Sequence, residues 1–140
     1  MTSKELTERI KRAGFRVTKP RLQVLSLLVK SKYPLRSGEI FKKLKQTSSA
    51  DKVTVYRILE AYKKAGLVNQ IDFRETAAYF EFKDSERDHH HIICVECKKV
   101  DDFVGCDADK LSAEALSQAP RFAKIINHSF EFFGLCRMCA

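Results

Sequence analysis

Two pairs of cysteines constrain this chain more than any other feature of its sequence. Cys94 and Cys97 form one Cys-x-x-Cys pair, and Cys136 and Cys139 form a second pair after 38 intervening residues. Each pair places two thiolates in a tight turn, so the two pairs together can surround one tetrahedral ion. Four thiolates favour zinc and leave no open position for catalysis. The spacing therefore predicts a structural zinc site that ties the start of the second half to the C-terminal end.

The size and composition of the chain agree with a metal-stabilised protein. Its 140 residues, 44% of them hydrophobic, suffice for one domain or two small ones, and small domains often need a metal or a partner subunit. No apolar run is long enough to span a membrane, and the N-terminus lacks a signal-peptide core. We therefore expect a cytoplasmic protein with no membrane association, in which cysteines bind metal instead of forming disulfides.

The net charge of +8 is unevenly distributed along the chain. Residues 1–83 carry 19 Lys and Arg against 8 Asp and Glu, whereas residues 84–140 carry 7 against 10. A basic half joined to a mildly acidic half suggests that only the first half faces a polyanion. A merely soluble surface is the alternative, so the charge acquires meaning only together with the motifs.

Hydrophobic periodicity predicts four helices and then two strands in the first half. Thr18 and Ser37 are expected to cap the second and third helices, and the fourth helix is expected at about residues 51–65 with Gly66 as its stop. Residues 67–73 and 76–82 alternate as strands, with a turn at Arg74 and Glu75. This order predicts a winged helix-turn-helix domain over residues 1–83, followed by a polar hinge at 84–88.

The second half, residues 89–140, is predicted to be a small α/β domain for dimerisation and metal binding. Strands are expected at residues 89–95, 99–104 and 123–133, with a helix at 108–118. This half has too few residues for an independent core, so a metal and a dimer interface are expected to stabilise it. The overall fold class is α+β. The fifth cysteine, Cys106, lies outside both pairs and is expected to be a packed side chain more than a ligand.

The helix expected at residues 51–65 has one apolar and one basic face. Val55, Ile58, Leu59 and Tyr62 recur at helical spacing and form the core face. In a helix-turn-helix the N-terminal part of the second helix enters the major groove, where arginine can pair with guanine, while other basic residues contact phosphates. The predicted DNA-binding residues are Arg16, Lys19, Arg21, Lys52, Thr54, Tyr56 and Arg57, although Tyr56 could instead pack against the third helix.

Several short motifs occur in order along nearly the whole chain. They are Arg16-Val-Thr-Lys-Pro-Arg21, Thr54-Val-Tyr-Arg-Ile-Leu59, Ala65-Gly-Leu-Val68, His89-His-His-Ile-Ile-Cys94 with Cys97, Asn127-His-Ser129, and Gly134 with the closing cysteine pair. Together they resemble the ferric uptake regulator family. The resemblance implies a homodimeric repressor that binds a palindromic operator in double-stranded DNA when its regulatory metal site is filled. It also implies an N-terminal winged helix and a C-terminal α/β dimerisation domain.

The resemblance also implies the ligands of further metal sites. The regulatory site would use Glu81, His89, His91 and Asp102, and a second site of the dimerisation domain would use Asp88, His90, Asp109 and His128. Imidazole and carboxylate donors admit iron(II), zinc or manganese, and we expect iron or zinc as the regulatory metal.

This chain departs from the family pattern at two places. Many members have a further histidine before the third helix, and residues 33–36 here contain none, so one ligand is missing or replaced. Lys98 stands where the family usually has glycine.

Two other classes of function are alternatives to a metal-responsive repressor. A constitutive structural-zinc module would bind nucleic acid without sensing metal. An enzyme is not expected, because the chain lacks the H-x-E and PCxxC motifs of deaminases, the nucleophile elbow, the P-loop and HExxH. No small organic substrate is therefore predicted.

Overall fold

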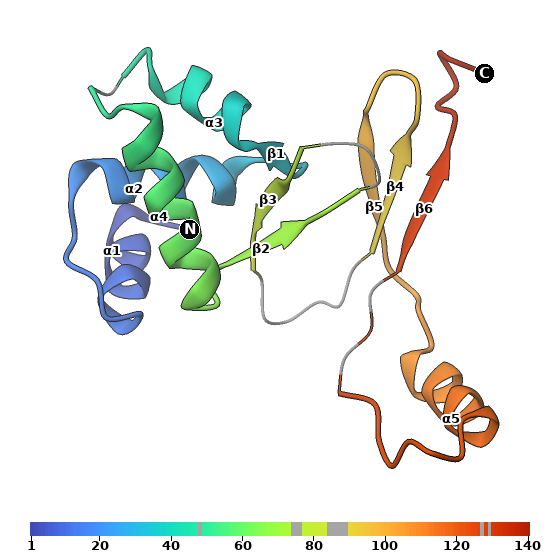
Figure 1. The fold of residues 1–140 in the computed structure, drawn as a ribbon. Helices are drawn as coiled ribbons and strands as arrows, with labels where there is room; N and C mark the ends of the chain where they lie inside the picture. The colour runs from blue at the N-terminus through green and yellow to red at the C-terminus, as the bar shows by residue number, and fades with distance from the viewer. Residues whose placement is uncertain (48, 74–76, 84–89, 127, 129) are drawn as a thin grey trace. The chain divides into compact units, whose positions relative to one another are not determined.

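The computed structural model describes residues 1–47, 49–73, 77–83, 90–126, 128 and 130–140. The chain divides into two compact units, Met1–Asp84 and Ser85–Ala140 (Figure 1). Helices and strands occur in both units, so the predicted α+β class is confirmed. The predicted hinge at residues 84–88 and the turn at Arg74 and Glu75 lie outside the described residues.

The first unit begins with four helices whose ends are set by local capping. They are α1 (Ser3–Arg12), α2 (Lys19–Lys30), α3 (Ser37–Leu44) and α4 (Lys52–Lys64). The Thr18 hydroxyl accepts from the Arg21 N–H at 3.4 Å, as predicted for an N-cap. The cap of α3 was predicted one residue late. Arg36 is the N-cap, because the Glu39 carboxylate accepts from its backbone N–H and holds its side chain at 2.9 Å.

Helix α4 is held at both ends and along its inner face. The Asp51 carboxylate caps its first turn by accepting from the Thr54 N–H at 2.8 Å. Gly66 follows its last turn with a φ of +76°, a conformation that glycine adopts without steric cost. The predicted core face is confirmed, since its four apolar side chains are all buried: Val55, Ile58, Leu59 and Tyr62. These join α1, α2 and α3 in one hydrophobic core.

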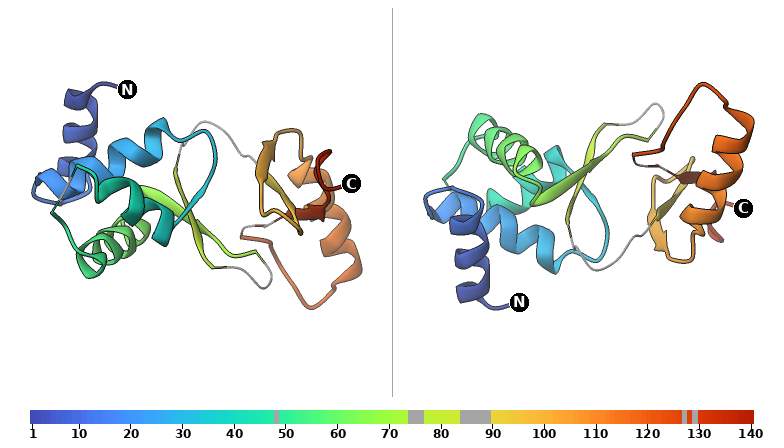
Figure 2. Two further views of the ribbon diagram at one scale, coloured as in Figure 1. Left: turned by 90° about the horizontal axis from the view of Figure 1, so that it is seen from above. Right: turned by 90° about the horizontal axis from the view of Figure 1, so that it is seen from below.

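A three-stranded antiparallel sheet completes the first unit. Its strands β1 (Leu35–Arg36), β2 (Val68–Ile71) and β3 (Tyr79–Phe82) lie in the order β1-β3-β2. The hairpin β2–β3 packs against the helices, with α4 against β2 and α2 against β3 (Figures 1 and 2). Strand β1 was not predicted, because two residues are too short to show a sequence periodicity.

The second unit contains a mixed sheet of three strands in the order β5-β4-β6. These are β4 (His90–Cys94), β5 (Val100–Phe103) and β6 (Glu131–Gly134). Strand β5 is antiparallel to β4 and β6 is parallel to it. The strand predicted at residues 123–133 is largely wrong. Pairing with β4 starts at Glu131, which lies opposite His91. Strand β4 begins at His90, so in the described part of the chain it has no residues left to pair with those before residue 130.

Helix α5 (Ala108–Gln118) forms as predicted but buries none of its residues. The Asp107 carboxylate caps it by accepting from the Lys110 N–H at 3.1 Å. Its apolar side chain Leu111 is 52% exposed. Within the described part of the chain, no helix has the length and apolar character needed to cross a membrane.

We expect Tyr62→Phe to lower the free energy of unfolding by about 1 kcal/mol, the net value of one buried hydrogen bond. The fully buried Tyr62 hydroxyl donates to the Arg21 carbonyl at 2.9 Å and joins α4 to α2. The matched control is Tyr56→Phe on the same helix, where the ring is 55% exposed, and it should change stability by less than about 0.5 kcal/mol. Urea unfolding of both variants checks this. An equal loss in both variants would contradict the assigned role of the hydrogen bond.

Candidate metal centres and nucleic-acid interface

The two cysteine pairs come together in the second unit. Cys94 ends β4 and Cys97 lies in the turn that leads to β5, while Cys136 and Cys139 follow β6. Because β4 and β6 are parallel, with Cys94 opposite Gly134, both pairs emerge at the same end of the sheet. The structure thus gathers four cysteines that the sequence separates into two distant turns.

The geometry of the four sulfurs fits a tetrahedral metal ion. All four Sγ atoms lie within 4.8 Å of one another, and the Cys97 and Cys136 sulfurs are 3.7 Å apart. A tetrahedral zinc ion with Zn–S bonds of about 2.3 Å requires S···S separations of about 3.8 Å. A disulfide would require about 2.05 Å, and all four cysteines are free. The donors therefore fit zinc, which when bound supplies a closed structural cross-link.

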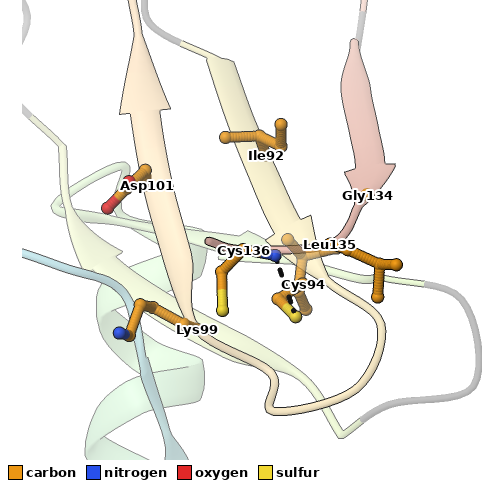
Figure 3. A pocket seen from close by; sticks show the side chains of 8 residues that line it. Ile92, Cys94, Lys99, Asp101, Gly134, Leu135 and Cys136 are labelled. Atoms are coloured by element: carbon orange, nitrogen blue, oxygen red, sulfur yellow. Dashed lines mark hydrogen bonds between the residues drawn. The ribbon is translucent and has the colours of Figure 1, made fainter. Parts of the chain in front are cut away.

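Backbone groups prepare some of these sulfurs for a cation. The Cys136 N–H donates to the Cys94 Sγ at 3.4 Å, and Figure 3 shows this bond beside the hollow lined by Ile92 and Leu135. Hydrogen bonds from backbone N–H groups, of which the one from Cys136 has the largest effect, lower the pKa of Cys94 to about 6. The hydrogen bond with the Cys136 sulfur raises the pKa of Cys139 to about 12. A metal is bound by the thiolate forms, so its binding would release the protons that these sulfurs carry.

The turn after the first pair carries an unusual backbone conformation. Lys98 has a φ of +64°, in the left-handed region that favours glycine. Its N–H donates to the Cys94 carbonyl at 2.9 Å, and its ammonium donates to the Val95 carbonyl at 2.8 Å. The position at which lysine replaces the glycine expected from the family is therefore one where glycine fits better. The ammonium bond, which glycine could not make, offsets part of the cost of lysine there.

The predicted regulatory ligands are distributed over both units. Glu81 lies half-buried on β3 in the first unit, whereas His91 on β4 and Asp102 on β5 lie in the second. His91 and Asp102 are register partners, so their side chains point to the same face of the sheet. His89 lies outside the described residues. Neither of the two donor clusters among the described residues contains His91 or Asp102.

Two features near these donors were not predicted. Glu131 on β6 is the other register partner of His91, so a second carboxylate shares that face. Glu131 is a neighbour of His91 only because β6 pairs in parallel with β4, and strand pairing cannot be deduced from the sequence pattern of either strand. Residues 33–36, where the family resemblance implies a further histidine, end in strand β1, in which Leu35 pairs with Phe80 and supplies no metal donor.

The second predicted site of the dimerisation domain is assembled differently from the expectation. His90 and His128 do come together, but their companion is Cys106, with donor atoms of all three within 4.8 Å of one another. Asp109 does not belong to this cluster, and Asp88 lies outside the described residues. Cys106 was expected to be a packed side chain more than a ligand, and its position after Gly105 gave no signal for this neighbourhood.

The predicted DNA-binding residues lie around two adjoining surface hollows of the first unit. Lys52, Tyr56 and Arg57 line one hollow together with Phe41 of α3. Three others line the second hollow, to which Arg57 also contributes: Arg16, Arg21 and Thr54. Lys19 is exposed at the start of α2.

Some of these residues also hold the surface in shape. The Arg21 guanidinium donates to the Arg16 carbonyl at 2.8 Å and lies 5.3 Å from the Phe15 ring. The ring of Tyr56 is exposed, so it is not buried against α3. Val53, which was not predicted, is 55% exposed and lines the same hollow as Tyr56 and Arg57. The sequence could have indicated this position, because Val53 lies one helical turn before Tyr56 and Arg57.

Comparisons with known proteins agree on one family. A model described as the ferric uptake regulator family matches residues 12–133. The ferric uptake regulation protein of Legionella pneumophila is 32% identical over 137 residues, covering 96% of this chain and 98% of its own. The peroxide operon regulator of Bacillus subtilis is 31% identical over 138 residues, covering 98% and 92%.

A solved structure extends the similarity to the fold. The structure of the Helicobacter pylori ferric uptake regulator, described as revealing three functional metal binding sites, matches with a TM-score of 0.82 and 27% identity. The match covers 99% of this chain and 94% of that chain.

We expect Cys97→Ser to abolish tight zinc retention. Mutation of residues that only hydrogen-bond to metal ligands typically weakens metal binding by about 10–100-fold. Replacing one of the four sulfur ligands themselves should weaken zinc binding by more than that. Cys97 is exposed, so the substitution removes little packing. The measurement is zinc content by mass spectrometry after dialysis against a chelator. Cys106→Ser is the matched control and should keep one tightly held zinc per chain. Retention of that zinc by Cys97→Ser would show that the four sulfurs are not its ligands.

Proposed function

The chain belongs to the ferric uptake regulator family, and on that premise we propose that it is a metal-dependent repressor of transcription. In this proposal a cytoplasmic homodimer binds a palindromic operator in double-stranded DNA when iron(II) or zinc fills its regulatory site. It thereby controls genes of metal-ion homeostasis. The observation that carries the proposal is that one chain combines a basic α4 surface with a separate unit of metal-donor strands.

The DNA-binding role is supported by the composition of the α4 surface. Lys52, Tyr56 and Arg57 are exposed at the N-terminal half of α4, on the side opposite its buried face. Arginine can donate two parallel hydrogen bonds to a guanine edge in the major groove, and tyrosine can contact a base or phosphate. Arg16 and Lys19 add positive charge before and at the start of α2, where phosphate contacts would orient the helix.

The homodimer is supported by apolar surface that the second unit leaves uncovered. Ile126 is 87% exposed and Phe122 is 67% exposed, and α5 buries no residue. Several large apolar side chains left exposed in one small unit are typical of a protein–protein interface. A second copy of this unit would cover such a surface, and two copies would present two α4 helices to a two-fold symmetric operator.

The metal response is proposed to use Glu81, His89, His91 and Asp102. Glu81 belongs to the first unit and the other three to the second, so an ion held by all four would link DNA binding to metal occupancy. His91 and Asp102 fit this role because they are opposite each other on adjacent strands. When bound, the ion supplies a cross-link. The chain supplies the nitrogen and oxygen donors and the side-chain orientation.

The relatives do not separate the possible signals, because a ferric uptake and a peroxide regulator are about equally similar. The assignment of iron or zinc therefore rests on the donor set. A constitutive zinc module is disfavoured, because the similar proteins are named as regulators of ferric uptake and of a peroxide operon.

We expect Arg57→Ala to weaken operator binding by about 1–3 kcal/mol per half-site, because a bidentate contact to guanine would be lost. The matched control is Lys64→Ala, which removes one positive charge from the exposed C-terminal end of the same helix. Lys64 should lie beyond the groove, so its variant should bind nearly as wild type does. Fluorescence anisotropy with metal-loaded protein measures both. Equal losses would mean that α4 contributes only general charge.

We expect Asp102→Ala to remove the metal dependence of DNA binding. In the wild type, chelated protein should bind the operator about 5–150-fold more weakly than iron-loaded or zinc-loaded protein. Asp101→Ala is the matched control, since adjacent residues on β5 point to opposite faces of the sheet. Anisotropy titrations with chelated, zinc-loaded and iron-loaded proteins test this. The sensor assignment fails if the wild type binds equally in all three states, and the ligand assignment fails if Asp102→Ala responds as Asp101→Ala does.

A further inference from the structure

A second cluster of metal donors, His90, Cys106 and His128, lies within the second unit. His90 begins β4, Cys106 lies between β5 and α5, and His128 lies between α5 and β6 (Figure 1). The Cys106 sulfur is 4.0 Å from Nε2 of His128. The fold therefore brings two loop residues to the first residue of the central strand.

His90 carries an independent sign that this cluster binds a ligand. Its side chain is 95% buried, and its Nε2 atom has no hydrogen-bond partner among the described residues. A buried polar atom without a partner is costly, because it has lost water and gained nothing in exchange. A metal–nitrogen bond at an imidazole nitrogen would remove that cost.

The spacing of the three donors is close to that of a metal shell. Bonds of about 2.0–2.1 Å to nitrogen and about 2.3 Å to sulfur place tetrahedral ligands about 3.4–3.8 Å apart. The distance of 4.0 Å between the Cys106 Sγ and the His128 Nε2 exceeds this range by a few tenths of an ångström. Both residues lie in loops, where such a shift requires no change in strand pairing.

Aromatic rings fix the buried member of the cluster. The His90 ring lies 5.6 Å from the rings of both Phe103 and Phe130, and 5.2 Å from the ring of His128. Phe132 packs against both phenylalanines. This apolar wall orients His90 and excludes water on one side, while the exposed His128 leaves the other side open to an entering ion.

We propose that His90, Cys106 and His128 bind a thiophilic divalent cation, with zinc as the natural ion. The family resemblance implied an all-nitrogen-and-oxygen shell containing Asp88 and Asp109. A sulfur donor in place of Asp109 shifts the preference from iron and manganese toward zinc and cobalt. Three protein ligands leave one position for water or another small ligand. This site is additional to the proposed regulatory site and does not depend on it.

Cobalt(II) added to protein that already holds one structural zinc tests the proposal. The regulatory donors contain no sulfur, so a sulfur-to-cobalt charge-transfer band in the near ultraviolet would arise from Cys106. We expect one equivalent of cobalt to produce this band while zinc stays bound. Absorption spectroscopy and the zinc content of the filtrate are the two readouts.

Variants assign the band to its ligands. Cys106→Ser should bind cobalt without the band, and His128→Ala, which alters an exposed side chain, should weaken cobalt binding at least tenfold. Asp102→Ala and Asp109→Ala are the controls and should keep the band. Circular dichroism and retained structural zinc establish that each variant is folded. The proposal is overturned if wild-type protein still lacks the band when cobalt binding is saturated, or if the band persists in Cys106→Ser. Neither result would affect metal-dependent operator binding.

Discussion

The second unit depends on the tetrahedron of sulfurs formed by its two cysteine pairs. In the described part of this unit, the buried apolar residues are only Ile93, Cys94 and Val100. A core this small cannot offset the entropy lost when the chain is ordered. A zinc ion would join the end of β4 to the segment after β6 and so close the sheet at one end. The first unit needs no such ion, because its four helices and hairpin share one hydrophobic core.

This difference between the units suggests that each unit has a separate function. The self-contained first unit presents the basic surface of α4, while the second unit holds the sulfur cluster, the His91 and Asp102 pair, and uncovered apolar residues. A unit stabilised by metal and by a second copy is suited to reporting metal occupancy. A unit with its own core can keep its DNA-binding surface intact in either state. The cluster around Cys106 extends this division, since it adds a sulfur-containing site to the same metal-binding unit.

The features that could be predicted from the sequence are those determined by residues close together in the chain. Helix α4 was predicted with its approximate bounds, its stop and its core face, because all three follow from residues within one segment. The sulfur cluster was predicted because each cysteine pair is a local turn with known chemistry. The strand expected at residues 123–133 failed because its length is set by where β4 begins. Cys106 and Glu131 were missed for the same reason, as their neighbours come from loops and strands far away in the sequence.

Hydrogen exchange of the full-length protein, measured by mass spectrometry before and after removal of zinc, tests the central claim most directly. If the sulfur-bound ion holds the second unit together, its removal should abolish the protection of amides in β4, β5 and β6. The buried segments of α2 and α4 should keep their protection, because their core contains no metal ligand. Unchanged protection in the second unit, or equal loss in both units, would contradict the account.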